Sequence, residues 1–487
     1  MGLGVDDYAV VVSPDSQKRF ATLGNPNPDA ARVLFTTQAQ LQNRSQAYHV
    51  RFNTLGDFFY QGRARQVRLW DESIVPSAVY TLEEDEIIRM LPIVRANNQA
   101  LYEILDAFRD QLKRKESGDT IYVPLIQGHG VGETKMTGWF PEKMAGAVRA
   151  LWSLQDRLCP VRRNKSMAVL DYKDQIPDDL APMLVLDASG RHRRTYPHWQ
   201  RYSGRVRFLS SPQKNYVGAT WHHWDHPAGR GQWHPKSDKL ETLVDAVVAE
   251  LEKIPADAGV LLFHYLQDAT TIDIPSAIRA RLPGRKLDFR NWGRQSATND
   301  FRDDRYVFLL GVAQPPPSLV EAIGRSVQGT WPDEPFSEQA RDDIRIGEAA
   351  HAIYQAANRG AMRVSRGAGV PEGLHLYTIF SSRGSMDIPL ELVPRIFPGI
   401  AVEPWRPLGV NLTGKVALLA DHIASRLDGH AGVTIAKAEL KAAAELRGPH
   451  LSRTLGHPAL ADWLDHQGLT MTVATKAIQV TRSSIRR

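Results

Sequence analysis

Residues 236–265, KSDKLETLVDAVVAELEKIPADAGVLLFHY, decide the expected fold. In residues 236–254 apolar side chains recur at three- and four-residue intervals, which predicts an amphipathic helix with Ser237 as its N-cap. The continuous apolar run of residues 259–265 predicts a strand that is buried on both faces, as parallel sheets require. A helix that leads into such a strand is typical of an α/β fold.

The same alternation extends on both sides of this stretch. Residues 274–282 are expected to be helical, and short apolar runs predict further strands at residues 10–13, 32–36, 66–70, 183–186, 206–209, 216–221 and 306–311. Strands and helices that alternate in this way predict doubly wound, mostly parallel α/β sheets.

We expect three domains. Residues 1–181 form the first and contain a helical insertion over about residues 82–158, with a kink or break at Pro92. Residues 182–395 form the second. A proline-rich linker over residues 381–407 leads to a small helical domain at residues 410–487.

Composition narrows the class of protein. The chain has 487 residues, of which 43% are hydrophobic and 23% charged, as in ordinary globular proteins. No run approaches the roughly 18 apolar residues of a membrane helix, and the acidic N-terminus is unlike a signal peptide. The single cysteine, Cys159, excludes an internal disulfide and a thiolate metal cluster within one chain. We expect a cytoplasmic protein without a membrane partner, and the net charge of +6 permits nucleic-acid binding.

Two short segments follow expected strands and carry polar side chains. Asp71 and Glu72 come directly after residues 66–70. A carboxylate pair at the carboxyl end of a parallel strand can hold Mg²⁺ and orient an attacking water, although acidic residues at such positions also cap helices. The segment LDAS (186–189) ends the first strand of the second expected domain, where Asp187 or Ser189 is suited to cap a helix.

Two further segments lie downstream. Thr298 and Asn299 precede the strand at residues 306–311 and fit either a phosphate contact or a polar loop. Gln355, Arg359 and Arg363 are four residues apart in a helical pattern, so they are expected to share one face. Such a row is commonly a solvated face, but an arginine that faces a nucleotide can stabilise a transferring phosphoryl group.

Taken in order, these segments resemble successive motifs of superfamily 2 DNA and RNA helicases, in particular the divergent phage- and plasmid-type branch of the DEAD/DEAH-like proteins. The resemblance covers about residues 30–365 and implies two RecA-like domains that clamp ATP and step along nucleic acid, the first of them incomplete. It is carried by VLFTTQAQL (33–41), LWDES (69–73), VLDAS (185–189), SATNDF (296–301) and QAANRGAMR (355–363).

The resemblance implies a role for each segment, with ATP and Mg²⁺ as cofactors and nucleic acid, DNA in preference to RNA, as partner. In the family's last motif a second arginine usually follows three residues after the first, whereas here Met362 holds that position and the arginine comes one residue later. The implied roles are Mg²⁺ coordination (Asp71), water positioning (Glu72), nucleic-acid contact (Thr36, Thr37, Thr298, Asn299), coupling of ATP state to domain movement (Asp187, Ala188, Ser189) and phosphoryl stabilisation (Gln355, Arg359 as arginine finger, Arg363).

The largest departure from the family is an absence. Such a helicase needs a phosphate-binding loop, G-x-x-x-x-G-K-[ST], ahead of its Asp-Glu motif, and none precedes Asp71. GHGVGETK (128–135) has the wrong spacing, and GVNLTGKV (409–416) ends in Val416 in place of the hydroxyl residue. A start upstream of Met1, a truncated gene and a loop supplied by another polypeptide are all compatible with this pattern. We therefore expect weak or absent ATPase activity or, alternatively, a non-catalytic nucleic-acid-binding or regulatory protein on a helicase scaffold.

Two regions outside these motifs also carry candidate residues. Residues 410–487 resemble a winged-helix or helix-turn-helix domain, with Thr434 as an N-cap and Lys437 and Lys441 near a phosphate backbone; the same pattern fits a protein-docking domain. Residues 221–234 contain four histidines and three tryptophans, which suggest zinc binding, base stacking or ordinary packing. Because neighbouring side chains of a strand point to opposite faces, His222 and His223 are not expected to share a metal.

Overall fold

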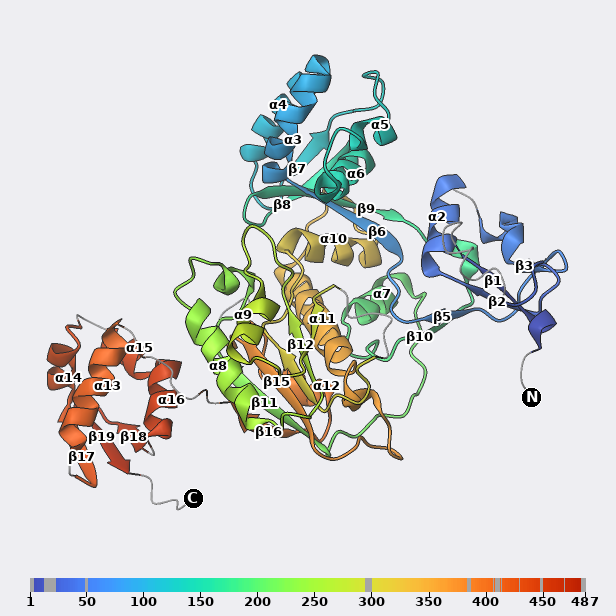
Figure 1. Cartoon of the computed structure of the whole chain (residues 1–487). Helices are drawn as coiled ribbons and strands as arrows, with labels where there is room; N and C mark the ends of the chain where they lie inside the picture. Colours follow the sequence, from blue (N-terminus) through green and yellow to red (C-terminus); the bar gives the residue numbers. More distant parts are fainter. Residues whose placement is uncertain are drawn as a thin grey trace. The chain divides into compact units, whose positions relative to one another are not determined.

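The structure is a computed structural model that describes residues 4–12, 23–48, 51–293, 300–382, 387–405, 407, 412, 414–428, 430–446, 450–467 and 469–482 (Figure 1). The chain divides into two compact units. The first unit comprises Met1–Ser210 and Gln314–His351, and the second comprises Ser211–Ala313 and Ala352–Arg487. The expected domain boundary at residues 181 and 182 therefore does not coincide with a boundary between these units.

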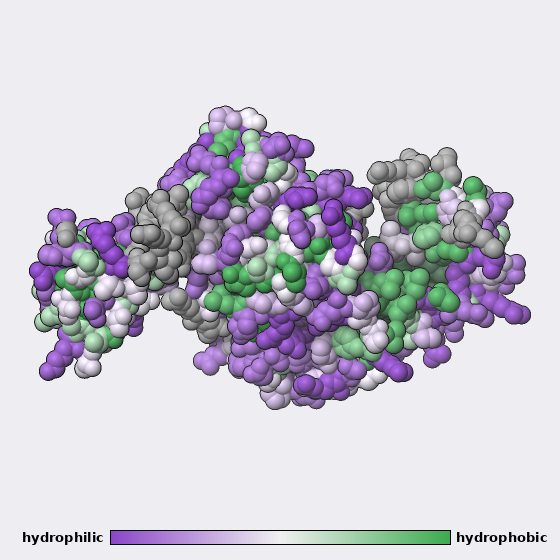
Figure 2. All heavy atoms as spheres, turned by 90° about the horizontal axis from the view of Figure 1, so that it is seen from below, coloured by the Kyte–Doolittle hydropathy of each residue, from purple (hydrophilic) through white to green (hydrophobic). Residues whose placement is uncertain are grey.

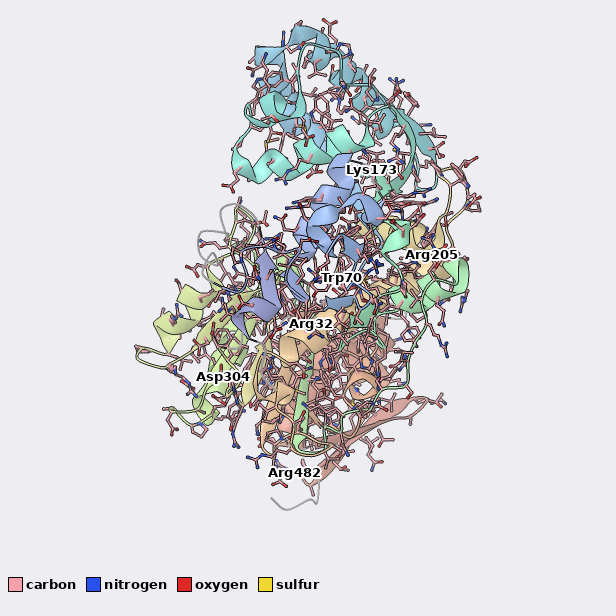
Figure 3. The ribbon with its side chains drawn as sticks, turned by 90° about the vertical axis from the view of Figure 1, so that its right-hand side faces the viewer. Arg32, Trp70, Lys173, Arg205, Asp304 and Arg482 are labelled. Atoms are coloured by element: carbon pink, nitrogen blue, oxygen red, sulfur yellow. The ribbon has the colours of Figure 1, made fainter. Side chains whose placement is uncertain are left out.

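The first unit contains two short parallel sheets. β1 (Tyr8–Val11) pairs with β2 (Val33–Thr36), and β5 (Leu69–Asp71) pairs with β10 (Leu184–Leu186). All four strands lie within or beside ranges that the apolar runs predict. Trp70 of β5, labelled in Figure 3, is buried in a core that also contains Ile74, Leu180 and Tyr196. The remaining elements of this part are α2 (Gln38–Tyr48) and the hairpin of β3 (Phe59–Tyr60) and β4 (Arg63–Ala64).

The segment between β5 and β10 contains the helices that the sequence predicts, but a four-stranded antiparallel sheet that it does not predict also runs through the segment. The strand order is β6-β9-β8-β7, and the helices share a core with the sheet (Figure 1). The strands are β6 (Ser77–Glu83), β7 (Thr120–Val123), β8 (Arg157–Arg163) and β9 (Met167–Asp174); the helices are α3 (Glu84–Asn97), α4 (Gln99–Lys113), α5 (Glu133–Thr137) and α6 (Ala145–Leu154).

The expected break at Pro92 falls elsewhere. Pro92 lies inside α3, and the helical pattern is interrupted at Asn98. The Asn98 side chain accepts a hydrogen bond of 3.0 Å from the backbone N–H of Leu101 and so caps α4. An N-cap at this position ends one helix and begins the next, which the spacing of apolar residues alone does not reveal.

Three more helices complete the first unit. α10 (Pro317–Gln328) packs against β6, β8, β9 and α7 (Thr195–Ser203). α11 (Glu338–Ala357) begins in the first unit and ends in the second. The buried carboxylate of Glu321 on α10 forms salt bridges with Arg325, at 2.9 Å, and with Arg341 of α11, at 3.0 Å. Because an unpaired buried charge is costly, these two arginines stabilise Glu321 in its buried position.

The second unit contains a six-stranded parallel sheet in the order β13-β12-β14-β15-β11-β16. Its apolar strands and the helices α8 and α9 share a core that includes Leu243, Leu262, Phe308 and Tyr377 (Figure 1). The strands are β11 (Ala219–Asp225), β12 (Val260–His264), β13 (Asp288–Asn291), β14 (Tyr306–Leu309), β15 (Leu374–Phe380) and β16 (Ala401–Pro404); the helices are α8 (Leu240–Lys253), α9 (Ile274–Arg281) and α12 (Leu392–Ile396).

Several local expectations for this unit are corrected. Residues 206–209 form no strand and are mostly exposed. Residues 381–407 are not a plain linker, since they contain α12 and also β16, which pairs with β11. α8 is capped at Lys239 rather than at Ser237, whose hydroxyl accepts from the Lys239 N–H at 3.2 Å.

The C-terminal part of the second unit forms a small α/β subdomain with its own core. A three-stranded antiparallel sheet, ordered β17-β19-β18, packs with four helices around Leu419, Ile423 and Ile478. Residues 469–482 make a hairpin of β18 and β19, and Thr434 lies in β17 instead of capping a helix. The elements are α13 (Gly414–Leu427), β17 (Gly432–Ala436), α14 (Lys437–Ala443), α15 (His450–Leu455), α16 (Pro458–His466), β18 (Leu469–Val473) and β19 (Ala477–Arg482).

The longest described helix is α11, with 20 residues, and charged side chains recur along it at Glu338, Arg341, Asp342, Arg345 and Glu348. Among the residues that the structure describes, no helix combines the length and apolar character that crossing a bilayer requires.

Candidate functional site

Three predicted motifs meet at the carboxyl ends of the parallel strands in the first unit. Thr36 ends β2 and Thr37 follows it, and the Gln38 side chain donates a hydrogen bond of 2.5 Å to the Asp71 carbonyl at the end of β5. Asp71 is in register with Leu186 of β10, and the Glu72 N–H donates to the Leu186 carbonyl at 3.1 Å. In α/β sheets ligands bind at this edge, so these contacts define a candidate ligand site.

Asp71 and Glu72 are both exposed at this edge. Glu72 adopts a left-handed backbone conformation with φ of 68°, which is uncommon for a residue with a side chain. The turn ends β5 and leaves both carboxylates open to solvent. Exposed carboxylate oxygens suit a hydrated Mg²⁺, which keeps several of its waters and takes only one or two carboxylates from a protein.

Asp187 and Ser189, in the turn that follows β10, are part of a hydrogen-bonded network. The Ser189 hydroxyl is fully buried and donates to Asp187 Oδ1 at 2.6 Å, while the Ser189 N–H donates to the same oxygen at 2.8 Å. The Tyr196 hydroxyl donates to Asp187 Oδ2 at 2.8 Å and accepts from the Ile74 N–H at 2.9 Å. Ala188 is exposed between these two residues. A buried hydroxyl in such a network suits structural coupling rather than nucleophilic attack.

The same turn is bound to α11 by residues that the sequence analysis did not single out. Arg193 donates to both oxygens of Glu348, at 2.7 and 3.0 Å, and the Thr195 hydroxyl donates to Glu348 Oε1 at 2.8 Å. Burial opposes ionisation of Glu348, but Arg193 outweighs burial and holds the pKa of this carboxyl below its ordinary value. The pair is therefore charged at neutral pH.

His351, one turn further along α11, completes the connection. Its Nδ1 atom lies 2.7 Å from Ser189 Oγ. Burial, reinforced by the charge of Arg193, lowers the pKa of His351, so the ring is neutral near pH 7. The Ser189 hydroxyl donates its proton to Asp187, so toward His351 it acts as an acceptor. The hydrogen-bond partners therefore place the ring proton of His351 on Nδ1, from which it is donated to Ser189.

In the second unit, Gln355 and Arg359 are brought together as expected. Arg359 is buried and its Nη2 donates to Gln355 Oε1 at 3.0 Å. The expected common face with Arg363 is wrong, because α11 ends at Ala357 and Arg363 lies exposed in a short 3-10 helix. Between α11 and this short helix, Gly360 packs so closely that a Cβ there would lie 2.6 Å from Val307 Cγ2, so a larger residue is not accommodated.

The remaining predicted contact residues are placed as follows. Thr298 and Asn299 lie outside the described residues. Lys437 and Lys441 lie four residues apart on α14, so they are neighbours on one side of this helix. Of the two partial matches to a phosphate loop, residues 128–135 span a turn and the start of the five-residue α5, while most of residues 409–413 fall outside the described part of the chain.

The histidines of β11 confirm the expectation from strand geometry. His222 Nε2 lies 3.0 Å from His375 Nδ1, whereas His223 Nδ1 lies 2.9 Å from the Thr378 hydroxyl, so the two rings have different partners. Within the described residues no group of three or more histidine, cysteine, aspartate or glutamate side chains is arranged to hold a metal ion. A zinc site built from residues 221–234 has no support among these residues.

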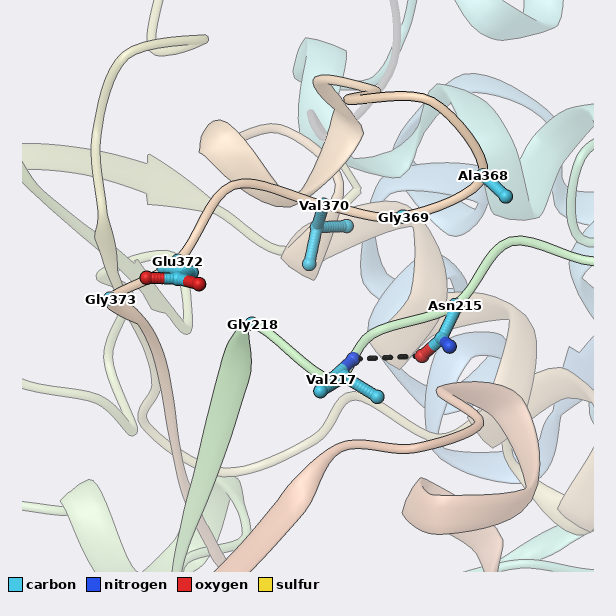
Figure 4. Close-up of a pocket in the computed structure, with 8 residues that line it drawn as sticks. All are labelled: Asn215, Val217, Gly218, Ala368, Gly369, Val370, Glu372 and Gly373. Atoms are coloured by element: carbon cyan, nitrogen blue, oxygen red, sulfur yellow. Dashed lines mark hydrogen bonds between the residues drawn. The ribbon is translucent and has the colours of Figure 1, made fainter.

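A pocket of the second unit lies at the wrong end of the sheet for a nucleotide. It is formed where β11 and β15 begin, and Glu372 is its one charged residue (Figure 4). Asn215 turns its carboxamide oxygen toward the N–H of Val217, at 2.9 Å, so this polar group is already used. The lining residues are Asn215, Val217, Gly218, Ala368, Gly369, Val370, Glu372 and Gly373.

One face of the β5–β10 sheet is apolar and uncovered. Leu69, Leu184 and Leu186 are 62, 42 and 50% exposed, whereas Trp70 on the opposite face is buried. Figure 2 shows a hydrophobic area over this part of the first unit. Within the described residues β10 pairs with β5 alone, although parallel sheets are normally covered on both faces.

Comparisons with known proteins add one structural likeness. No protein-family model and no curated protein sequence matches the chain. The chain is similar in structure to an XPD helicase, with a TM-score of 0.39 and 12% sequence identity over 80% of this chain and 76% of that chain. A likeness at this level identifies neither an activity nor a site.

Proposed function

We propose that this chain is a helicase-like protein that binds nucleic acid and carries part of an ATP-hydrolysing site. The observation that carries the proposal is the meeting of Asp71 and Glu72 with Asp187–Ser189 at the carboxyl edge of adjacent parallel strands. The order of the motifs along the sequence supports the same interpretation, as does the Gln355–Arg359 contact beyond them.

The residues present fit Mg²⁺ better than they fit ATP. Asp71 offers an exposed carboxylate for the ion and Glu72 a second carboxylate that can position a water. Bound Mg²⁺ would supply charge neutralisation at the phosphates. The backbone N–H cradle, the lysine and the hydroxyl of a G-x-x-x-x-G-K-[ST] loop are missing ahead of Asp71, so these residues do not by themselves form a phosphate site.

Nucleic-acid binding is the part of the function that residues 1–487 can perform without this loop. The net charge is +6, and Lys437 and Lys441 present two cations on one side of α14 in a subdomain with its own core. Cations at such spacing neutralise phosphates without reading sequence. DNA is the proposed partner in preference to RNA.

The deciding experiment measures binding and turnover on the same preparation of the full chain. Fluorescence anisotropy with a single-stranded DNA oligonucleotide is followed across a salt titration, and phosphate release is measured with and without this DNA. We expect salt-dependent binding, with log K falling linearly with log salt concentration, and little or no turnover. Absence of DNA and RNA binding at low salt would overturn the proposal.

The alternative is a non-catalytic binding or regulatory protein, and the missing phosphate loop favours it. The two candidates differ in the effect of the nucleotide. If Mg²⁺-ATP shifts DNA affinity in wild type and not in Asp71→Asn, the partial ATP site is functional. DNA affinity that is identical with and without Mg²⁺-ATP supports the non-catalytic alternative.

A further inference from the structure

The stretch of chain that contains α7 is rich in arginine and lacks acidic residues. Residues 188–210, which belong to the first unit, contain six arginines and no lysine, aspartate or glutamate. Arginine is less strongly hydrated than lysine and stacks on planar rings, which suits it to contact with nucleic acid. The arginines of this stretch are Arg191, Arg193, Arg194, Arg201, Arg205 and Arg207.

Three of these arginines are open to an anionic ligand. Arg205, labelled in Figure 3, pairs with Asp178 at 2.6 Å. Arg194, Arg201 and Arg207 are exposed, and within the described residues they form no ion pair. Arg194 caps α7 with helical backbone angles and Arg201 follows two turns later, so both lie on the same side of the helix.

Two aromatic side chains are exposed among these arginines. Tyr202, in the last turn of α7, is 54% exposed, and Phe208, in the extended segment after the helix, is 43% exposed. The Tyr202 ring lies parallel to that of His198, with an interplanar angle of 6° and centroids 6.2 Å apart. His198 is buried and lies 3.2 Å from the Gln328 amide of α10, which fixes it. A ring held in this way loses little conformational freedom when a base stacks on it.

We propose that the exposed side of α7 and the segment after it bind single-stranded nucleic acid, with unpaired bases stacked on Tyr202 and Phe208. A single strand exposes the faces of its bases to aromatic rings and its phosphates to the cations between them, whereas a duplex keeps the base faces inside. This inference deepens the proposed function and rests on it, because it assigns the same partner a contact surface other than the lysines of α14. The α7 surface comprises Arg194, Arg201, Tyr202, Arg207 and Phe208.

The test is fluorescence anisotropy of the full chain with a labelled oligothymidine strand and with a duplex of the same length. Tyr202→Ala should weaken single-strand binding about tenfold, through loss of one stacked base, and change duplex binding by under about twofold. Tyr202→Phe keeps the ring and should retain the wild-type affinity. Tyr122→Ala is the matched control and should change neither affinity, because Tyr122 lies on β7 of the same unit with the same exposed fraction of 54%.

Two further variants test the rest of the α7 surface. Replacing Arg201 and Arg207 together by Gln should lower the slope of log K against log salt by about 1.4 for the single strand. Phe208→Ala lies outside the helix and should also weaken single-strand binding about tenfold, so it decides the test if Tyr202→Ala fails to fold.

The outcomes separate this inference from the proposed function. If the wild-type chain binds no nucleic acid, both fall together. If it binds, but Tyr202→Ala and Phe208→Ala leave single-strand affinity unchanged or weaken single strand and duplex equally, the α7 surface is overturned while the proposed function stands.

Discussion

The Arg193–Glu348 pair offers a quantitative test of how α11 is held. The two side chains are 7 and 11% exposed and share two hydrogen bonds. Glu348→Ala leaves a buried guanidinium without its counter-charge, which costs about 3 kcal/mol or more. At about 2–4 °C per kcal/mol for a unit of this size, the melting temperature of the first unit should fall by about 6–12 °C.

The assay is thermal unfolding at pH 7, followed by circular dichroism, for the two single variants and the double variant. Because the pKa of Glu348 is depressed in the folded state, its contribution is fully present above the unfolded carboxyl pKa of about 4.3 and is lost as pH falls through the folded value. Arg193→Met combined with Glu348→Ala should recover much of the loss, since no unpaired charge then remains. Glu338→Ala is the matched control, because Glu338 lies on the same helix with a side chain 73% exposed and should cost under about 1 kcal/mol. The reasoning would be refuted if the melting temperature of Glu348→Ala fell by under about 2 °C, or if the losses of the two single variants simply added up in the double variant.

Three further predictions concern activity, binding and pH. Purified chain should hydrolyse ATP weakly or not at all, and any weak turnover should be lost in Asp71→Asn; robust phosphate release by the wild-type chain that this substitution abolishes contradicts the missing-loop argument. Replacing Lys437 and Lys441 by Gln should lower the slope of log K against log salt by about 2 in a DNA-binding titration, whereas an unchanged slope places the phosphate contacts elsewhere. Burial, reinforced by the charge of Arg191, lowers the pKa of His192 to about 4. The folded chain therefore keeps its full stability above the unfolded pKa of about 6.5 and loses part of it as pH falls toward 4, because the unfolded chain then binds a proton that the folded chain does not. His192→Gln should therefore flatten the fall in melting temperature across this window, and parallel curves for variant and wild type would show that His192 titrates as in the unfolded chain.

Several of the parallel strands could be predicted from the sequence because they are short, continuous apolar runs, whereas β13, β15 and β16 were missed. Val260–His264 and Tyr306–Leu309 are buried on both faces, so no polar residue interrupts them. The same logic placed Asp71 and Asp187 each at the end of a strand, but in different domains, whereas β5 and β10 pair within the first unit. Pairing of strands so far apart in the sequence is a long-range contact that the offset of a residue from its own strand does not reveal.

The antiparallel sheet of the first unit escaped prediction for a physical reason. β8 has the sequence RLCPVRR, in which charged ends and a proline hide the buried Cys159 and Val161. The adjacent helices α3 and α4 have strong three- and four-residue periodicity that dominates the segment. Local patterns report helices well, but antiparallel pairing depends on partners that lie far away in the sequence.

The contacts of α11 could not be foreseen either. Charged residues on a helix predict a solvated face, yet Arg193 and Glu348 are buried because they satisfy one another. The signal that was present is the polar stripe of Glu348, His351 and Gln355 in a helix otherwise rich in alanine. Such a stripe indicates a partner surface without saying which one.

The leucines of β5 and β10 have a consequence for the isolated protein. An open strand edge beside uncovered apolar side chains is a template on which other chains can add strands, and concentrated protein would polymerise there edge to edge. Leu186→Lys would place a charge on the exposed face and reduce this association, while Trp70 on the opposite face stays buried.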